Sequence, residues 1–211
     1  MKLTTLVIAA ALAAGCSVHG DERSFMVGTK VVPATPSTAA NAIGCVYDAT
    51  TPENVFGAFD PAFGYVHAVV VENRMVDNAS LGPGRIGTND FQVEGATITT
   101  DVLIGPAQSI ATQTVPANGL VKIATSSPIA VVLAQPGAIA AGSTVRFNIQ
   151  VFGHLLDGSS VKTNRYEYAA NAIAGFTPAT PTCATGQTLT ACEGTHQDTT
   201  VVCQGAAATG P

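Results

Sequence analysis

Residues 143–168, STVRFNIQVFGHLLDGSSVKTNRYEY, decide the fold. Their first half alternates apolar and polar side chains, a period of two that predicts a β-strand with one buried face. Asp157-Gly158 is typical of a two-residue hairpin turn, because glycine readily adopts the positive φ that such a turn requires. The stretch therefore predicts a β-hairpin. The apolar side chains that alternate along its first strand are Val145, Phe147, Ile149 and Val151.

A hairpin closed by this turn sorts both of its strands into an apolar and a polar face. Phe147 then lies opposite Tyr168, and Ile149 lies opposite Tyr166, on the buried face. A bulge at Gly153 would shift the register by one residue and separate these partners. Because one register sorts both strands, the pattern favours this pairing over a slipped one. The outward face collects Gln150 with Arg165, Asn148 with Glu167, and Arg146.

Other strands are predicted upstream of the hairpin. Residues 65–76 are apolar and β-branched, and Phe91 and Val93 alternate with polar neighbours. The later apolar residues of that second run occupy even-numbered positions, whereas Phe91 and Val93 occupy odd ones. Gly95 lies between the two sets, so we predict a bulge or bend there. Three more short runs are separated by turn-forming stretches. The runs are residues 110–115, 120–125 and 129–133, and the stretches are residues 116–119, 126–128 and 135–137.

Short strands at near-regular spacing, without a convincing helical period, predict an all-β fold. We expect an antiparallel β-sandwich, immunoglobulin-like or related, over residues 44–176. Within it, His67 is predicted to be a core or rim histidine and not a ligand, and Asn73 a buried amide that bonds to backbone.

The N-terminal residues 1–15 have the features of a secretory signal peptide. Lys2 supplies a positive charge, residues 3–14 carry none, and small residues precede Cys16. The apolar run is too short for a membrane-spanning helix, which needs about 20 residues. The alternative is an ordinary signal peptide in which Cys16 has no special role.

The stretch Leu12-Ala-Ala-Gly-Cys16 resembles the lipobox of bacterial lipoproteins, with Ala13 where that family most often has leucine. The resemblance implies that Cys16 becomes the first residue of the mature chain and carries acyl chains, which would anchor the protein to a membrane. Ser17 implies, by the sorting rule of enterobacterial lipoproteins, the outer membrane. Residues 16–43 are predicted to be the lipidated cysteine and a flexible tether, because they are rich in Pro, Ser, Thr and Ala and lack an apolar period.

Four further cysteines, at positions 45, 183, 192 and 203, predict two disulfide bonds in an exported chain. Sequence alone allows three connectivities, and we prefer Cys192–Cys203 with Cys45–Cys183. The rival hypothesis is a zinc site in which His196 joins Cys183, Cys192 and Cys203, although these spacings lack a short Cys-x2–4-Cys knuckle. Residues 177–211 are predicted to be a cysteine-rich, loop-like tail.

Composition and motifs narrow the function classes. The chain of 211 residues has Lys+Arg 9 against Asp+Glu 14, so it lacks the basic excess that binding a phosphate backbone requires, and no nucleic-acid partner is expected. The sequence has no nucleophile elbow, zinc-protease, phosphate-loop or dinucleotide motif. We therefore predict no catalytic residue, no resident metal and no cofactor. The carboxylates Asp90, Glu94 and Asp101 do not all lie on one face of the predicted strand, so we do not expect them to form a catalytic pair.

Several blocks together resemble a group of uncharacterised lipoproteins common in myxobacteria. They are Val69-Val-Val-Glu-Asn-Arg-Met75, Phe91-Gln-Val-Glu-Gly-Ala96, the hairpin around Gly153-His-Leu-Leu-Asp-Gly158, and Cys192-Glu-Gly-Thr-His-Gln-Asp-Thr-Thr-Val-Val-Cys203. The resemblance covers roughly residues 45–203 and implies a β-sandwich with a cysteine-rich end, without an assigned activity. The chain departs from the group at residues 171–175, where relatives often have further cysteines, and this puts the disulfide pairing in doubt.

These observations lead to three hypotheses of function. The first is a membrane-anchored lipoprotein of the cell envelope, expected at the outer membrane, that acts as a non-enzymatic binding or structural module. The second is an accessory subunit of a larger envelope or secretion assembly, which an exposed sheet edge or a large apolar patch would favour. The third is a hydrolase with an unrecognised active site, which a deep polar pocket with convergent titratable groups would favour. The expected partners are the membrane, through the acyl chains, and an envelope protein.

Overall fold

The computed structural model describes residues 56–75, 88–179, 182, 184–186 and 196–198 with their side chains, and the backbone of five further strands. These five strands are β1 (Phe25–Gly28), β2 (Val32–Pro33), β3 (Tyr47–Asp48), β12 (Gln187–Ala191) and β13 (Val201–Gly205). The other described strands are β4 (Phe56–Phe59), β5 (Tyr65–Asn73), β6 (Phe91–Ile104), β7 (Gln113–Val121), β8 (Ser126–Ala134), β9 (Ser143–Leu155), β10 (Ser160–Lys162) and β11 (Tyr166–Ala172).

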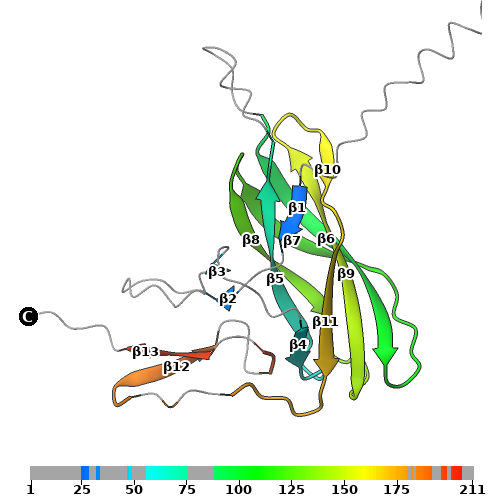
Figure 1. Ribbon diagram of the computed structural model, residues 1–211, viewed down its shortest axis with the longest axis vertical. Helices are drawn as coiled ribbons and strands as arrows, with labels where there is room; N and C mark the ends of the chain where they lie inside the picture. The colour runs from blue at the N-terminus through cyan, green and yellow to red at the C-terminus, as the bar shows by residue number, and fades with distance from the viewer. Residues whose placement is uncertain are drawn as a thin grey trace, which may run out of the picture.

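Two larger sheets organise these strands (Figure 1). One has the order β4-β11-β9-β6-β7 with β10 paired to β9, and the other has the order β1-β5-β8. The pairs β2–β3 and β12–β13 form two small sheets. The all-β prediction is confirmed, but the expectation of purely antiparallel pairing is wrong for β4, which runs parallel to β11 with Phe56 opposite Ala169. The two strands are far apart in the chain, so no hairpin turn fixes their relative direction.

The register predicted for the hairpin is confirmed. Ile149 lies opposite Tyr166 and Phe147 lies opposite Tyr168, while Asn148 faces Glu167 on the other side. The four aromatic and aliphatic side chains of the first two pairs are buried, and Glu167 is exposed.

The turn that produces this register differs from the predicted one. Leu155 N donates to Ser159 O at 2.9 Å, so the loop has three residues, 156–158, and Gly158 takes a φ of +86°. The longer loop shifts the pairing of β9 with β10 by one residue, which places Ser160 opposite His154. A three-residue hairpin loop that ends in a glycine of positive φ is a common alternative to the two-residue turn.

An irregularity in the returning strand reverses this shift. Thr163 N still donates to Val151 O at 2.9 Å, in the register set by the loop. Tyr166 is then opposite Ile149, so three steps along the returning strand match two steps along β9. Gln150, which was predicted to face Arg165, instead donates its Nε2 to Thr163 O at 2.8 Å. The two one-residue shifts cancel, and the predicted aromatic pairs therefore form.

The bulge predicted at Gly95 is confirmed, since both partners of β6 change register between Val93 and Gly95. The turns predicted over residues 116–119 and 126–128 are wrong, because β7 and β8 run through them. The chain turns instead at residues 122–125, where Thr125 N donates to Lys122 O at 3.2 Å. Proline is tolerated in both strands because each ends the order of its sheet, where a ladder N–H is dispensable.

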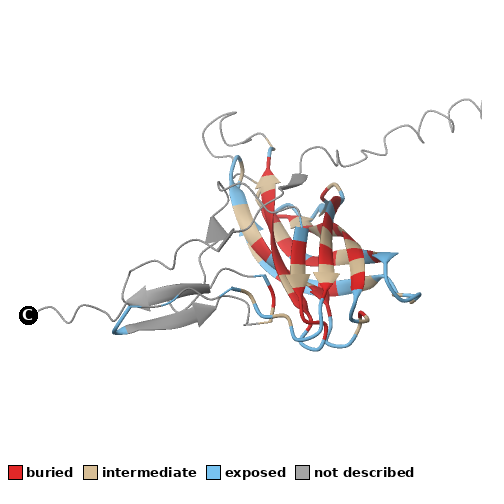
Figure 2. Ribbon diagram, turned by 60° about the horizontal axis from the view of Figure 1, so that its bottom comes forward, coloured by how far each residue is buried: buried red, intermediate tan, exposed pale blue. Residues whose placement is uncertain are grey.

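The core lies between the two larger sheets, and their buried side chains form one cluster. Figure 2 marks the buried residues in red along the strands. Along β9, buried residues alternate with partly buried ones over the whole strand. Asn73 is fully buried, and its Nδ2 donates to Asn89 O at 2.8 Å and to Val121 O at 3.1 Å. The prediction of a buried amide bonded to backbone is thus confirmed. The largest fully buried side chains are Tyr65, Phe59, Phe91, Phe147, Ile98, Ile129, Leu133 and Ile149.

The two ends of the chain contain more strand than the sequence predicted. Strands β1 and β2 lie within residues 16–43, the predicted tether, and β1 pairs with β5. The loop-like prediction for residues 177–211 is wrong where β12 and β13 pair as an antiparallel sheet. Cys203 lies in β13. The predicted lipidation and disulfides fall outside the described residues, because Cys16, Cys45, Cys183 and Cys192 are not among them.

Candidate functional site

A set of hydrogen bonds and ring contacts joins a short C-terminal stretch to β4 and β5. Residues 196–198, here named the docking segment, run antiparallel to β4, with Gln197 opposite Phe59. Asp60 N donates to His196 O at 2.7 Å, and Asp198 N donates to Ala58 O at 2.8 Å. The docking segment therefore continues the larger sheet beyond its last strand.

Gln197 connects the docking segment to β5. Its side chain is 4% exposed, its Oε1 accepts from Val66 N at 3.0 Å, and its Nε2 donates to Val66 O at 2.7 Å. The described residues of β1 pair with Val70 to Asn73 of β5, so Val66 lies outside that pairing. The primary amide thus satisfies both main-chain groups of a partly buried strand residue, as a neighbouring strand would.

Asp198 completes the junction through two tyrosines. The Tyr65 hydroxyl donates to Asp198 Oδ1 at 2.9 Å and lies 2.8 Å from the Tyr168 hydroxyl, which donates to Asp198 Oδ2 at 3.5 Å. Gly57 makes room for this cluster, because an added Cβ would collide with both hydroxyls and lie 2.8 Å from Asp198 Oδ2. A side chain at position 57 would therefore break the cluster.

Burial sets the protonation states of the cluster. It raises the pKa of Tyr65 well above its usual value, and the neighbouring Tyr168 and Asp198 raise it further, so the phenol remains a hydrogen-bond donor. Asp198 is exposed as a residue, but its carboxyl end reaches the tyrosines. Burial of that end raises the pKa of Asp198, while the Tyr65 hydrogen bond acts in the opposite direction. The carboxyl group is thus partly desolvated and held by donors from the core.

Stacked rings surround the junction. The His196 ring lies on the Phe63 ring with centroids 3.6 Å apart and planes within 5°. His67, which is 9% exposed, stacks on Tyr168 at 4.1 Å, and Tyr65 stacks on Phe59 at 4.7 Å. These contacts agree with the prediction that His67 is a core or rim histidine, and they fix the orientation of both tyrosines.

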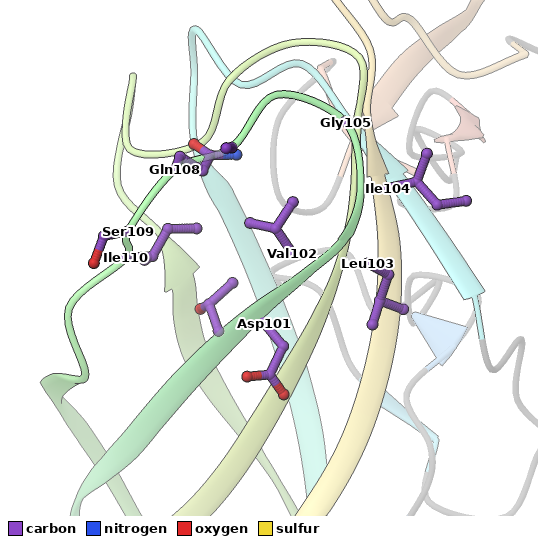
Figure 3. A pocket seen from close by; sticks show the side chains of 10 residues that line it. Asp101, Val102, Leu103, Ile104, Gly105, Gln108, Ser109 and Ile110 are labelled. Carbon is purple, nitrogen blue, oxygen red and sulfur yellow. The ribbon is translucent and has the colours of Figure 1, made fainter.

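A shallow depression lies elsewhere, at the end of β6 (Figure 3). It is lined by residues 100–105 and 107–110, and Gln108 fastens its loop by donating to Ser143 Oγ and accepting from Ala140 N, both at 3.0 Å. Leu103 and Ile104 on its rim are 51% and 68% exposed. The depression is a surface feature with two exposed apolar side chains on its rim, and its loop is fastened to Ala140 and Ser143.

The carboxylates that the sequence analysis weighed are engaged separately. Asp101 Oδ2 accepts from Arg146 Nη2 at 2.8 Å and from Asn148 Nδ2 at 3.0 Å, and Arg146 holds the pKa of Asp101 below its usual value. Glu94 pairs with His154 at 3.0 Å, and Asp90 Oδ1 accepts from Ile123 N at 3.0 Å. No group of three or more His, Cys, Asp or Glu side chains placed to hold a metal occurs within the described residues.

The residues of the junction were missed by the sequence analysis. Gln197 and Asp198 lie in a stretch predicted to be loop, and Gly57 lies outside any predicted strand. The block from Cys192 to Cys203 was noted for its cysteines and for its resemblance to other lipoproteins, and neither observation pointed to Gln197 or Asp198. His196 was considered as a zinc ligand, and the structure places its ring on Phe63.

Comparison of the chain with protein-family models, with curated proteins and with solved structures finds no match. Among the described residues, no helix combines the length and the apolar character that crossing a bilayer demands.

Proposed function

We propose that this protein is a membrane-anchored lipoprotein of the cell envelope that acts as a non-enzymatic binding or structural module. The sequence that ends in Gly15-Cys16 supports the anchor, and Ser17 supports the outer membrane. The observation that carries the module hypothesis is the junction at Asp198. Its buried polar groups, which are chemically suited to acid–base work, are instead engaged in holding the docking segment to β4 and β5.

The finer architecture belongs to the same proposal. The two larger sheets would form a β-sandwich of immunoglobulin-like or related type, because their buried faces share one cluster of side chains. Two disulfides, preferably Cys192–Cys203 and Cys45–Cys183, would tie the C-terminal region to the domain. Peptide mapping under non-reducing conditions should find all four cysteines oxidised, whereas free thiols with stoichiometric zinc would support the metal site instead.

Lipidation is tested in the native host. Wild-type protein should partition into the detergent phase of a phase separation and begin with an acylated Cys16, because acyl chains are the predicted anchor. Cys16→Ser should move the protein to the aqueous phase, and Ser17→Ala, the matched control, should leave it in the detergent phase. An unmodified N-terminus that begins at another residue would refute the anchor.

The accessory-subunit hypothesis is the second candidate, and the exposed side chains of Leu103 and Ile104 favour it. A photo-crosslinking amino acid at position 104 should then capture one defined envelope protein in intact cells. Position 156 is the matched control, because Leu156 is 53% exposed in the β9–β10 loop. Equal or absent labelling at both positions would contradict the subunit hypothesis.

A further inference from the structure

The docking segment has a dedicated contact for each of its three residues. His196 stacks on Phe63, Gln197 bonds both main-chain groups of Val66, and Asp198 bonds the hydroxyls of two tyrosines. Two main-chain hydrogen bonds, one to Ala58 of β4 and one from Asp60 directly after it, accompany these side-chain contacts. Main-chain bonds to a sheet edge combined with side-chain pockets are the features of peptide recognition by β-augmentation.

The groove that receives the docking segment, formed by β4, β5 and the hydroxyl end of Tyr168, is built by the rest of the domain. Tyr65 and Tyr168 are 2% and 3% exposed and are packed in the core cluster, so their hydroxyl groups have fixed positions. The main-chain groups of β4 are placed by its pairing with β11. Gly57 keeps the floor of the groove open where any side chain would fill it. The groove is therefore complementary to the docking segment without being part of it.

We propose that this groove is a peptide-recognition site for an extended His-Gln-Asp segment, and that a second copy of this chain can supply the segment in trans. In the structure the chain fills its own groove, and Tyr168 and Asp198 are 30 residues apart in sequence. Exchange of an identical segment between two copies uses surfaces that are already complementary, which makes it a low-cost route to a dimer. The partner is thus a second copy that engages the groove through residues 196–198.

The recognition is selective for an amide followed by an acid. The primary amide of Gln197 accepts from Val66 N through one atom and donates to Val66 O through another, so Gln197→Ala removes both bonds. The loss of two hydrogen bonds to a buried strand corresponds to a decrease in affinity of about tenfold or more. Asp198→Ala removes the acceptor of the tyrosine hydroxyls.

Peptide binding tests the groove. The probe is a fluorescent peptide with the sequence of residues 193–200, and the receptor is the full chain with Gln197→Ala and Asp198→Ala, which vacates its own groove. The vacated receptor should bind the probe, and a control peptide with alanine at the position of Gln197 should bind it about tenfold more weakly or worse. Wild-type chain, with its groove filled, should bind the probe more weakly than the vacated receptor does. Equal binding of probe and control peptide, or none by a folded vacated receptor, would overturn the proposal.

A receptor with one conservative substitution is used if the double variant does not fold. Full chain with Asp198→Asn alone keeps the shape of the docking segment and should bind the probe more tightly than wild type does. Failure of this folded variant to bind more tightly than wild type would also count against the groove.

Mixing two complementary variants tests whether a second copy can supply the docking segment. A blocked chain with Gly57→Val keeps its docking segment but has no room for Asp198, and the vacated chain keeps its groove but lacks the side chains of Gln197 and Asp198. Each should be monomeric alone, and an equimolar mixture should form a one-to-one dimer in analytical ultracentrifugation. A mixture that stays monomeric at concentrations that saturate the peptide site would refute exchange between copies.

Discussion

Phe147→Ala is the perturbation that tests the core most directly. Phe147 is fully buried, lies opposite both Tyr168 and Thr100 in the ladders of β9, and places its ring 6.1 Å from that of Tyr65. Its side chain therefore belongs to the cluster that the two larger sheets share. Truncation removes a ring from the middle of that cluster and leaves the outer faces of both sheets untouched.

The expected loss of stability has two parts. Full burial of a phenylalanine side chain contributes about 1.5–3 kcal/mol through transfer from water. The cavity that remains adds about 24 cal/mol for each Å³ that the surroundings fail to fill. β9 is held between β6 and β11, so it cannot easily move to close the cavity. We therefore expect a decrease in the free energy of unfolding of about 3–5 kcal/mol, typical of buried phenylalanines.

Denaturant unfolding followed by circular dichroism measures this decrease. Phe56→Ala is the matched control, because Phe56 lies in the same sheet but is 47% exposed, and its truncation should cost about 1 kcal/mol or less. The m-values should agree between the variants, since each unfolds the same domain. If Phe147→Ala costs no more than Phe56→Ala, the shared core and the register that places Phe147 in it are wrong.

Three further substitutions test separate parts of the fold. Asn73→Ala should lower the free energy of unfolding by about 2–4 kcal/mol, measured in the same way, because two buried carbonyl groups lose their donor; a change below about 0.5 kcal/mol would show that the site relaxes. Gly153→Ala should cost about 1–3 kcal/mol, because its Cβ would collide with the carbonyl oxygen of Gln92, and a stabilised variant would contradict the close approach of β9 and β6. The lowered pKa of Asp101 predicts a stabilising contribution that is present at neutral pH and lost as the pH falls below about 4. Asp101→Asn should reduce this acid-induced loss in thermal melts at a series of pH values, and parallel melts of variant and wild type would exclude the contribution.

The hairpin could be predicted because the residues that determine its pairing lie close together in the sequence. Alternation along β9 fixes which side chains are buried, and the aromatic residues of β11 can face them in only one parity. The details of the turn could not be predicted in the same way, since a two-residue turn and a three-residue loop share the signal Asp157-Gly158. The register was nevertheless right because the irregularity between Thr163 and Tyr166 compensates for the longer loop.

Proline misled the prediction of turns at two places. Pro116 and Pro128 were taken to end strands, but each lies inside a strand that ends the order of its sheet. Sheet order is a tertiary property, so a proline in an edge strand cannot be distinguished from one in a turn by local sequence. The parallel pairing of β4 with β11 has the same cause, because it joins segments more than 100 residues apart in a way that no short-range pattern encodes.

The junction at the docking segment could not be predicted for a related reason. Gln197 and Asp198 bond Val66 and Tyr65 across sequence separations of 131 and 133 residues. A stretch rich in Thr, Gly and Gln without apolar alternation is typical of loop, and its polar side chains give no sign that β4 and β5 will receive them. Gly57 carries the clearest signal in retrospect, since a glycine inside a strand often marks a close approach of other atoms.

The docking segment also changes what the subunit hypothesis requires. An uncovered sheet edge would have favoured a partner that adds a strand, and β4 ends the order of the larger sheet. Residues 196–198 cover β4 at Ala58 and the chain directly after it at Asp60, and at the other end of that sheet Leu120 O of β7 accepts from Ser127 Oγ of β8 at 3.3 Å. An accessory subunit would therefore reach the domain through the apolar rim at Leu103 and Ile104, or through exchange of the docking segment, which uncovers the edge of β4. The two routes are separable, because Gly57→Val closes the chain's own groove to a docking segment and does not alter the residues of the rim.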